Sequence, residues 1–230
     1  MTTNRHHQTL VFDVLGSLLD EDAGMLAASA GIVGADDAGA FAATWSQHVA
    51  DAMSDVRAGR RSYAVSESIH ADAVAAAGTH HGVPAADAQV REAARFGRRL
   101  EPFAEVPEAL ERLAHDHRLV ALTNAGVTQA FEMSGHAGLR WTTLLSGETV
   151  GAYKPDPRMY EHAITALQLD PSACLFVAAH PWDLDAAAAA GFRTAYVDRA
   201  ASSAQQMDEY RHRFEHAEPD LAALATTLLA

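Results

Sequence analysis

The segment Leu10-Val11-Phe12-Asp13-Val14-Leu15-Gly16-Ser17 is the most informative part of this chain about its fold. Its apolar start, Leu10 to Phe12, predicts a buried parallel strand that ends at a carboxylate. Ligands of an open α/β sheet bind beyond the carboxyl ends of its strands, so we expect Asp13 at a functional edge. Gly16 permits a sharp turn, and Ser17 places a hydroxyl close behind the carboxylate. An isolated Asp after a strand more often caps a turn, so the functional interpretation depends on the rest of the chain.

The composition narrows the class of protein. The chain has 230 residues, of which 49% are hydrophobic, enough for one sizeable core or a core with a smaller insertion. It has no run of about 18 or more uncharged apolar residues, so we expect no membrane span, and residues 1–8 lack the apolar centre of a signal peptide. The net charge of −13 argues against nucleic acid and anionic membranes as partners. A single cysteine, Cys174, excludes an internal disulfide and favours a cytoplasmic location.

Residues 18–100 have a helical pattern that interrupts the alternation of strands and helices. An apolar stripe at intervals of three and four predicts one long helix ending near Gly59; its members are Phe41, Trp45, Val49, Met53 and Val56. Further helices are expected before Gly78 and from Pro84 to about Phe96. A helical block inserted directly after the first strand is interpreted as a cap over the carboxyl end of the sheet.

The alternation resumes from residue 101. Strands are expected at 119–122, 144–145, 174–178 and 194–197, with helices at 107–116, 127–136, 157–169, 183–190 and from 220 to the end. This order predicts an α/β fold with a Rossmann-like, doubly wound, mostly parallel sheet. Residues 1–17 and 101–230 would form the core domain, and residues 18–100 an all-helical cap domain.

Polar groups are predicted at three further strand ends or helix starts. Thr123-Asn124 follows the second strand, Lys154 precedes a capped helix, and Asp183 follows the strand 174–178. Each is weak alone, because a loop lysine is usually solvated and Thr-Asn after a strand is usually a turn. The carboxyl ends of neighbouring parallel strands share one edge, so we expect these groups to meet Asp13 in one crevice.

This ordered set resembles the haloacid dehalogenase superfamily, and within it the L-2-haloacid dehalogenase (type II) branch, over essentially the whole chain. The matching stretches are Phe12-Asp13-Val14-Leu15-Gly16-Ser17, Leu122-Thr123-Asn124, Tyr153-Lys154-Pro155-Asp156-Pro157-Arg158-Met159-Tyr160 and Val177-Ala178-Ala179-His180-Pro181-Trp182-Asp183. The resemblance implies a hydrolase acting on carbon–halide bonds. Asp13 would attack C2 of a small 2-halocarboxylate and expel halide, and water would hydrolyse the resulting aspartyl ester.

The resemblance also implies a site without metal or other cofactor. Superfamily phosphatases carry a second aspartate two positions after the nucleophile and a Mg²⁺ ligand four residues before the aspartate that matches Asp183. Leu15 and Ala179 stand at these positions here, and a hard cation needs several oxygen ligands. The histidine pairs His6-His7 and His80-His81 lack the spacing of a zinc site.

The resemblance gives the other catalytic residues expected roles. Lys154 would hold Asp13 ionised, because a nearby positive charge favours the carboxylate. Asp183 would hold Lys154 and polarise the hydrolytic water. His180 stands where the family usually has asparagine, and it is interpreted either as a general base for the ester step or as a structural residue.

The expected substrate-binding residues are Ser17, Ser46, Thr123, Asn124, Tyr160 and Trp182. Thr123 and Asn124 would donate hydrogen bonds to the substrate carboxylate and to the departing halide. Tyr160 and Ser17 would support the nucleophile or substrate, and Trp182 would supply an apolar wall. Ser46 follows Trp45 where the dehalogenases have a halide-cradling arginine; a hydroxyl stabilises an anion much less.

Three arginines close to the cap helix, Arg57, Arg60 and Arg61, are candidates to replace the missing guanidinium, although helix-end arginines are more often solvated. Two alternatives to the dehalogenase interpretation stay open: a hydrolase of the same superfamily acting on another small carboxylate or a phosphate ester, and a catalytically idle binding module. A homodimer, with Trp45 and Met53 at its interface, is a further expectation.

Overall fold

The computed structural model describes residues 8–230. The predictions for the polar start of the chain and for the His6-His7 pair therefore lie outside the described residues. Within residues 8–230, no helix combines the length and the apolar character needed to cross a membrane.

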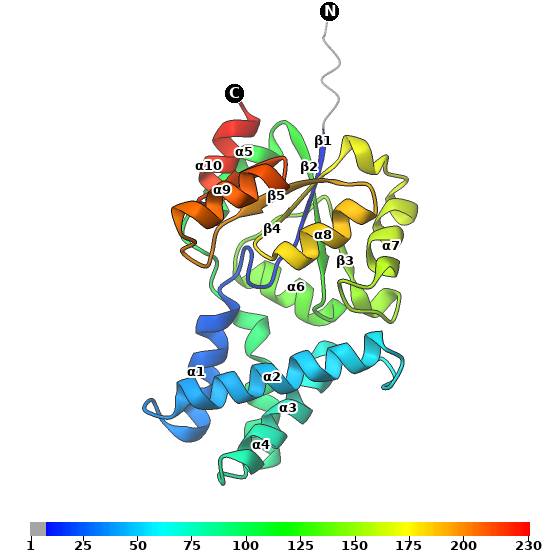
Figure 1. Cartoon of the computed structure of the whole chain (residues 1–230). Coiled ribbons are helices and arrows are strands. Elements are labelled where there is room, and N and C mark those ends of the chain that lie inside the picture. Colours follow the sequence, from blue (N-terminus) through cyan, green and yellow to red (C-terminus); the bar gives the residue numbers. More distant parts are fainter. Residues whose placement is uncertain (1–7) are drawn as a thin grey trace, which may run out of the picture.

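A six-stranded parallel sheet forms the centre of the described structure, in the order β3-β2-β1-β4-β5-β6 (Figure 1). The strands are β1 (Gln8–Phe12), β2 (His117–Thr123), β3 (Thr143–Ser146), β4 (Leu175–Ala178), β5 (Arg193–Val197) and β6 (His216–Glu218). Phe12 pairs with Ala121 of β2 and with Val177 of β4. The chain order reverses between β1 and β4, and such a switch point is where an open α/β sheet binds ligands.

Helices cover both faces of the sheet, because successive strand side chains point to opposite sides. Leu10 and Phe12 pack with α5 (Val106–Ala114), α6 (Val127–His136) and α10 (Leu221–Leu228). Val11 belongs to the opposite core, which contains residues of α7 (Pro157–Leu167), α8 (Pro181–Ala189) and α9 (Ala204–Arg213). The predicted doubly wound α/β fold is confirmed.

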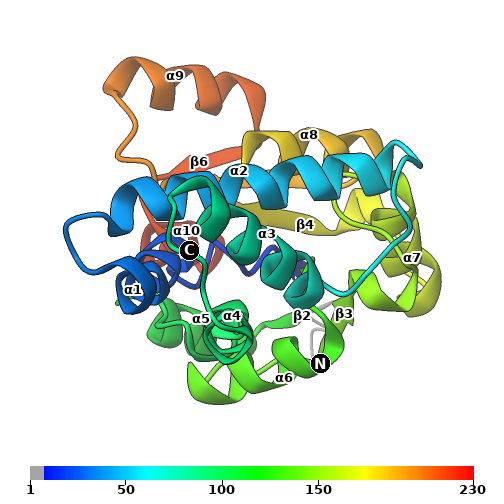
Figure 2. The ribbon, with the colours of Figure 1, turned by 90° about the horizontal axis from the view of Figure 1, so that it is seen from below.

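Four further helices form a cap at the carboxyl ends of the strands (Figure 1). They are α1 (Glu21–Val33), α2 (Ala38–Arg57), α3 (Ser66–His80) and α4 (Asp87–Ala94). Seen from below, α2 runs across this end of the molecule (Figure 2). The cap has its own apolar core, which includes Phe41, Trp45, Val49 and Val56. The predicted stripe of α2 is therefore confirmed as cap packing.

Several expected elements differ in the structure. The helix α3 continues past Gly78 to His80, and α4 begins at Asp87 rather than at Pro84. Three elements were not predicted: α1, α9 and β6. The reason is clearest for α9, in which Met207 is the one buried residue, so the helix carries no apolar stripe. The expectation that Trp45 contributes to a dimer interface is wrong, because Trp45 is completely buried inside the cap.

Candidate active site

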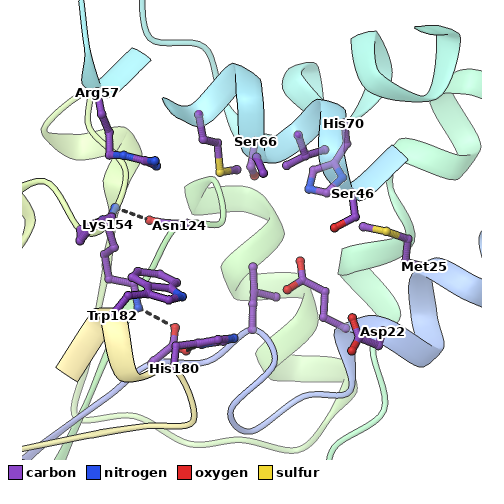
Figure 3. Close-up of a pocket in the computed structure, with 17 residues that line it drawn as sticks. Asp22, Met25, Ser46, Arg57, Ser66, His70, Asn124, Lys154, His180 and Trp182 are labelled. Carbon is purple, nitrogen blue, oxygen red and sulfur yellow. Dashed lines mark hydrogen bonds and ion pairs between the residues drawn. The ribbon is translucent and has the colours of Figure 1, made fainter. Parts of the chain in front are cut away.

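A cavity of about 500 Å³ lies between the cap and the sheet, at the switch point (Figure 3). Its sheet side is formed by Asp13, Leu15, Asn124, Lys154, Pro155, His180 and Trp182. Its cap side is formed by Glu21, Asp22, Met25, Ser46, Val49, Ala50, Met53, Arg57, Ser66 and His70. The predicted crevice therefore exists, and residues from both parts of the chain enclose it.

Asp13 follows β1 and is only 4% exposed. Its Oδ1 accepts a hydrogen bond from the Lys154 ammonium at 2.6 Å. Its Oδ2 accepts one from the Ser17 hydroxyl at 2.6 Å and lies 3.0 Å from Nδ1 of His180. Burial alone would raise the pKa of Asp13, but Lys154 and His180 lower it well below its usual range. Asp13 is therefore a carboxylate at neutral pH.

Lys154 lies between two carboxylates and is only 2% exposed. Its ammonium is 2.6 Å from Asp13 Oδ1 and 2.6 Å from Asp183 Oδ2. Burial alone would lower the pKa of Lys154, but the two carboxylates raise it above its usual value. The backbone N–H of Lys154 donates to Oδ1 of Asn124 at 2.7 Å, which ties its loop to the end of β2. Lys154 is thus a permanently charged partner of Asp13.

Asp183 is completely buried and does not line the cavity. One of its carboxylate oxygens accepts from Lys154 and the other from the Tyr160 hydroxyl. Burial raises its pKa, an effect that Lys154 opposes and the charge of Asp13 reinforces. The expected contact with Lys154 is present. The role expected of Asp183 toward the hydrolytic water stays a prediction.

Ser17, Thr123 and Tyr160 are completely buried and lie outside the cavity lining. The Ser17 hydroxyl accepts from the backbone N–H of Ala179 at 2.8 Å, besides donating to Asp13. The Thr123 hydroxyl accepts from the backbone N–H of Ala125 at 3.1 Å. The expected support of the nucleophile by Ser17 is present, and Tyr160 reaches it through Asp183 and Lys154. The substrate contact expected of Thr123 stays a prediction, with its side chain behind the cavity wall.

His180 and Trp182 stand at the start of α8 and line the cavity, with ring centroids 5.3 Å apart. Burial alone would lower the pKa of His180, but its hydrogen bond to Asp13 and the charge of Asp13 raise it. The cation is therefore favoured while Asp13 is ionised. Trp182 is 44% exposed, so it lies at the open side of the cavity.

The cap contributes Ser46 and Arg57 from α2 (Figure 3). In Figure 3, Arg57 is on the side of Lys154, whereas Ser46 is beside Met25 and His70. The Arg57 guanidinium makes no side-chain hydrogen bond or ion pair with a described residue, although its charge adds to the effect of Arg158 in lowering the pKa of Asp156. Arg60 and Arg61 instead pair with Asp55 at 2.7 Å and Asp72 at 2.5 Å. Of the three candidate arginines, Arg57 is the one that lines the cavity.

Glu21 and His70 also line the cavity, and sequence reasoning missed both. Burial raises the pKa of Glu21 to about 7, with smaller effects from neighbouring charges. Burial lowers the pKa of His70 to about 4, and its ring packs edge-on against Trp45 at 5.7 Å. Neither residue carries a distinctive local signal, since an acidic residue in the first turn of a helix is ordinary.

The donor set around Asp13 does not fit a metal ion. Among residues 8–230 no group of three His, Cys, Asp or Glu side chains is arranged to hold one. Leu15 lines the cavity beside Asp13, and Ala179 precedes His180; neither side chain carries an oxygen. A hard divalent cation prefers six or more oxygen ligands. These residues therefore provide no site for Mg²⁺.

The fold and this site define a capped α/β enzyme with a buried aspartate at the switch point of its sheet. A family model described as haloacid dehalogenase-like hydrolase matches residues 7–191. The chain therefore belongs to the haloacid dehalogenase-like hydrolases, as the sequence predicts.

Individual relatives agree with this assignment. The (S)-2-haloacid dehalogenase of Pseudomonas sp. (strain YL) is 40% identical over 114 residues, 48% of this chain and 49% of the relative. The (S)-2-haloacid dehalogenase of Pseudomonas putida is 26% identical over 204 residues, 87% of this chain and 88% of the relative. The chain spans about half the length of the first relatives it matches.

A solved structure of an L-2-haloacid dehalogenase is 26% identical, with a TM-score of 0.85 over 97% of this chain and 99% of that chain. The enzyme from Xanthobacter autotrophicus, 20% identical, has a TM-score of 0.84 over 97% of this chain and 99% of its own, and supports the fold.

Proposed function

We propose that the protein displaces halide from an (S)-2-halocarboxylate through a covalent ester on Asp13. The observation that carries this proposal is a buried carboxylate, kept ionised by Lys154, at a cavity enclosed by the cap. Relatives named (S)-2-haloacid dehalogenase supply the substrate class.

The two oxygens of Asp13 are held differently. Oδ1 receives one hydrogen bond, from Lys154, whereas Oδ2 contacts both Ser17 and His180. Oδ1 therefore keeps more lone-pair capacity and is the attacking atom in our proposal. It bonds to C2 of the substrate while the carbon–halogen bond breaks and its electron pair leaves with the halide. Oδ2 becomes the carbonyl oxygen of the ester, with two donors already aimed at it.

Two side chains of the lining suit an anionic substrate. The Arg57 guanidinium lines the cavity, forms no hydrogen bond or ion pair among residues 8–230, and would bind the substrate carboxylate. The Oδ1 of Asn124 is committed to the backbone of Lys154, so its amide nitrogen remains as a donor for the departing halide. Trp182 and the apolar cap residues Met25 and Met53 would surround the rest of the substrate. Ser46 also lines the cavity, but its side chain carries no charge to bind an anion.

The remaining expectations belong to the same proposal. Residues 18–100 would act as a cap domain that shields the ester from bulk water, over a core of residues 1–17 and 101–230. We expect a small carboxylate as the partner, rather than nucleic acid or membrane, because the chain carries a net charge of −13. A cytoplasmic location fits the single buried cysteine. A homodimer stays a prediction.

The test is release of chloride from (S)-2-chloropropionate in excess chelator, with Asp13→Asn as the control. Our proposal expects release that survives chelation and disappears in the variant. Phosphate release from a generic phosphate ester that requires Mg²⁺, without any halide release, would contradict it and support the phosphatase alternative. Because Leu15 and Ala179 offer no metal ligand, we do not expect that outcome.

A further inference from the structure

The face of α2 that borders the cavity is a single row of side chains along more than half of the helix. The row consists of Ser46, Val49, Ala50, Met53 and Arg57, all of which line the cavity. They recur at intervals of three and four, which places them on one side of a helix. At about 1.5 Å per residue, the row extends over about 16 Å from Ser46 to Arg57. The cavity therefore follows α2 and has two distinct ends.

The end at Arg57 suits the carboxylate of the substrate. Figure 3 shows Arg57 on the side of Lys154 and Asn124. The Lys154 ammonium is 2.6 Å from Oδ1 of Asp13, so the nucleophile belongs to this end as well. The carboxylate and C2 of a 2-halocarboxylate are directly bonded, so both have to lie between Arg57 and Asp13. The space that remains for the substituent on C2 extends along α2 toward Ser46.

The middle of the row is apolar and has room beside it. Ala50 is exposed and Met53 is half-buried, although both belong to the wall between cap and sheet. Leu15 and Met25 line the same cavity from other elements. Its volume of about 500 Å³ is in the range of pockets that hold drug-sized ligands, far more than a single methyl substituent fills. Apolar surface that no protein atom covers favours an apolar group of the ligand.

The end at Ser46 has no cation. In Figure 3, Ser46 is beside Met25 and His70, and Asp22 is on the same side. Burial lowers the pKa of His70 to about 4, so its imidazole is neutral at pH 7. A second carboxylate at this end would meet the charge of Asp22 without a counter-charge. The far end is therefore suited to an uncharged group.

We propose that the cavity binds (S)-2-halocarboxylates whose C2 substituent is an alkyl chain longer than methyl, and that Ser46 limits the length of that chain. This inference rests on the proposed function. The carboxylate binds at Arg57, and the chain lies against Met53 and Ala50. Ser46 determines specificity because its small side chain leaves the far end open. The arginine that stands there in the dehalogenases that the sequence resembles would fill this space.

The experiment measures chloride release from (S)-2-chloro derivatives of propionate, butanoate, hexanoate and octanoate. In the wild type, kcat/KM should rise by about 2- to 4-fold for each added methylene until the row is covered. Ser46→Leu fills the far end without adding charge. Its ratio of kcat/KM for the octanoate to that for the propionate should be lower than the wild-type ratio by about 10-fold or more.

Gln47→Leu is the matched control. It adds the same side chain one residue later, at an exposed position outside the cavity lining, and should keep the wild-type ratio. Ala50→Leu is a second variant, which narrows the middle of the row and should lower the ratio already for the hexanoate. Each ratio compares two substrates on one protein, so a loss of folded enzyme cancels.

The outcomes separate this inference from the proposed function. Wild-type protein that releases chloride, but whose kcat/KM does not rise from the propionate to the octanoate, overturns the inference and leaves the proposed function intact. A rise that both Ser46→Leu and Ala50→Leu leave unchanged also overturns it, because the chain then lies away from α2. A higher kcat/KM for (S)-2-chlorosuccinate than for (S)-2-chlorobutanoate contradicts the uncharged far end. No chloride from any substrate overturns both proposals.

Discussion

Nδ1 of His180 lies 3.0 Å from Oδ2 of Asp13, so an imidazole stands directly against the carboxylate at the centre of the site. The Ser17 hydroxyl donates to the same oxygen at 2.6 Å. The Lys154 ammonium donates to the other oxygen, Oδ1, at 2.6 Å. Oδ2 therefore has two hydrogen-bond contacts and Oδ1 has one, so Oδ1 keeps the greater lone-pair capacity for substrate.

The first prediction concerns that imidazole. His180→Phe removes a donor to a charged oxygen, a contact that contributes about 1.5–3 kcal/mol, so kcat for halide release should fall by about 10- to 100-fold. His180→Asn keeps a donor and should lose less. Steady-state chloride release measures both variants. Equal kcat values for His180→Phe and wild type would show that the hydrogen bond from His180 to Asp13 Oδ2 does not contribute to halide release.

The second prediction concerns the buried ammonium. Lys154→Met leaves Asp13 and Asp183 in the interior without a counter-charge, so the free energy of unfolding should fall by about 3–5 kcal/mol at pH 7 and halide release should disappear. Adding Asp183→Asn to Lys154→Met removes one of the stranded charges and should recover part of the stability. Urea unfolding of the single and double variants measures this. If the double variant recovered no stability, lost packing rather than the unpaired charge would account for the destabilisation by Lys154→Met.

The third prediction separates Arg57 from its neighbour. Arg57→Gln removes the cavity guanidinium and should raise KM for (S)-2-chloropropionate by about 10- to 100-fold, the effect of a lost charged hydrogen bond. Arg60→Gln is the matched control, because Arg60 pairs with Asp55 and does not line the cavity. Its KM should equal that of the wild type. Similar KM values for all three proteins would place the substrate carboxylate elsewhere.

The fourth prediction uses the raised pKa of Glu21. Its value moves from 4.5 to about 7 on folding, so the folded state holds this proton more tightly and ionisation opposes folding as pH rises through that window. Glu21→Gln cannot ionise. Relative to wild type it should therefore gain stability between pH 5 and pH 8, by up to about 3 kcal/mol, as measured by urea unfolding. If the free energies of unfolding of Glu21→Gln and wild type differed by the same amount at pH 5 and at pH 8, burial of the Glu21 carboxyl group would be contradicted.

The fifth prediction concerns Tyr160, which lies behind the cavity wall and holds Asp183 by a hydrogen bond. Tyr160→Phe removes the hydroxyl that donates to Asp183, leaving a buried acceptor unpaired at a cost of about 1–3 kcal/mol. We expect lower stability and a lower kcat with unchanged KM, because the effect passes through Lys154. Tyr196→Phe is the control, since its hydroxyl binds Asp198 at 2.9 Å and lies outside the cavity lining. A KM effect confined to Tyr160→Phe would instead indicate substrate contact.

Much of the fold follows from local patterns. The strand before Asp13 and the helix Val127–His136 were predictable because buried runs and apolar periodicity are properties of short segments. The same holds for the start of α7, where Asp156 accepts from the N–H of Arg158. The helix α9 was not predictable in this way, because its polar sequence becomes a helix over a single buried contact, Met207.

The meeting of Asp13, Lys154 and Asp183 was predictable from the sequence, because each residue stands at a strand end or helix start of one parallel sheet. Which side chains reach the cavity became evident from the packing of the folded chain. Asp183 and Tyr160 lie behind its wall, whereas Glu21 and Arg57 line it. Cavity access depends on how the cap packs across the sheet, through contacts between residues far apart in the chain, and a local sequence pattern does not contain that information.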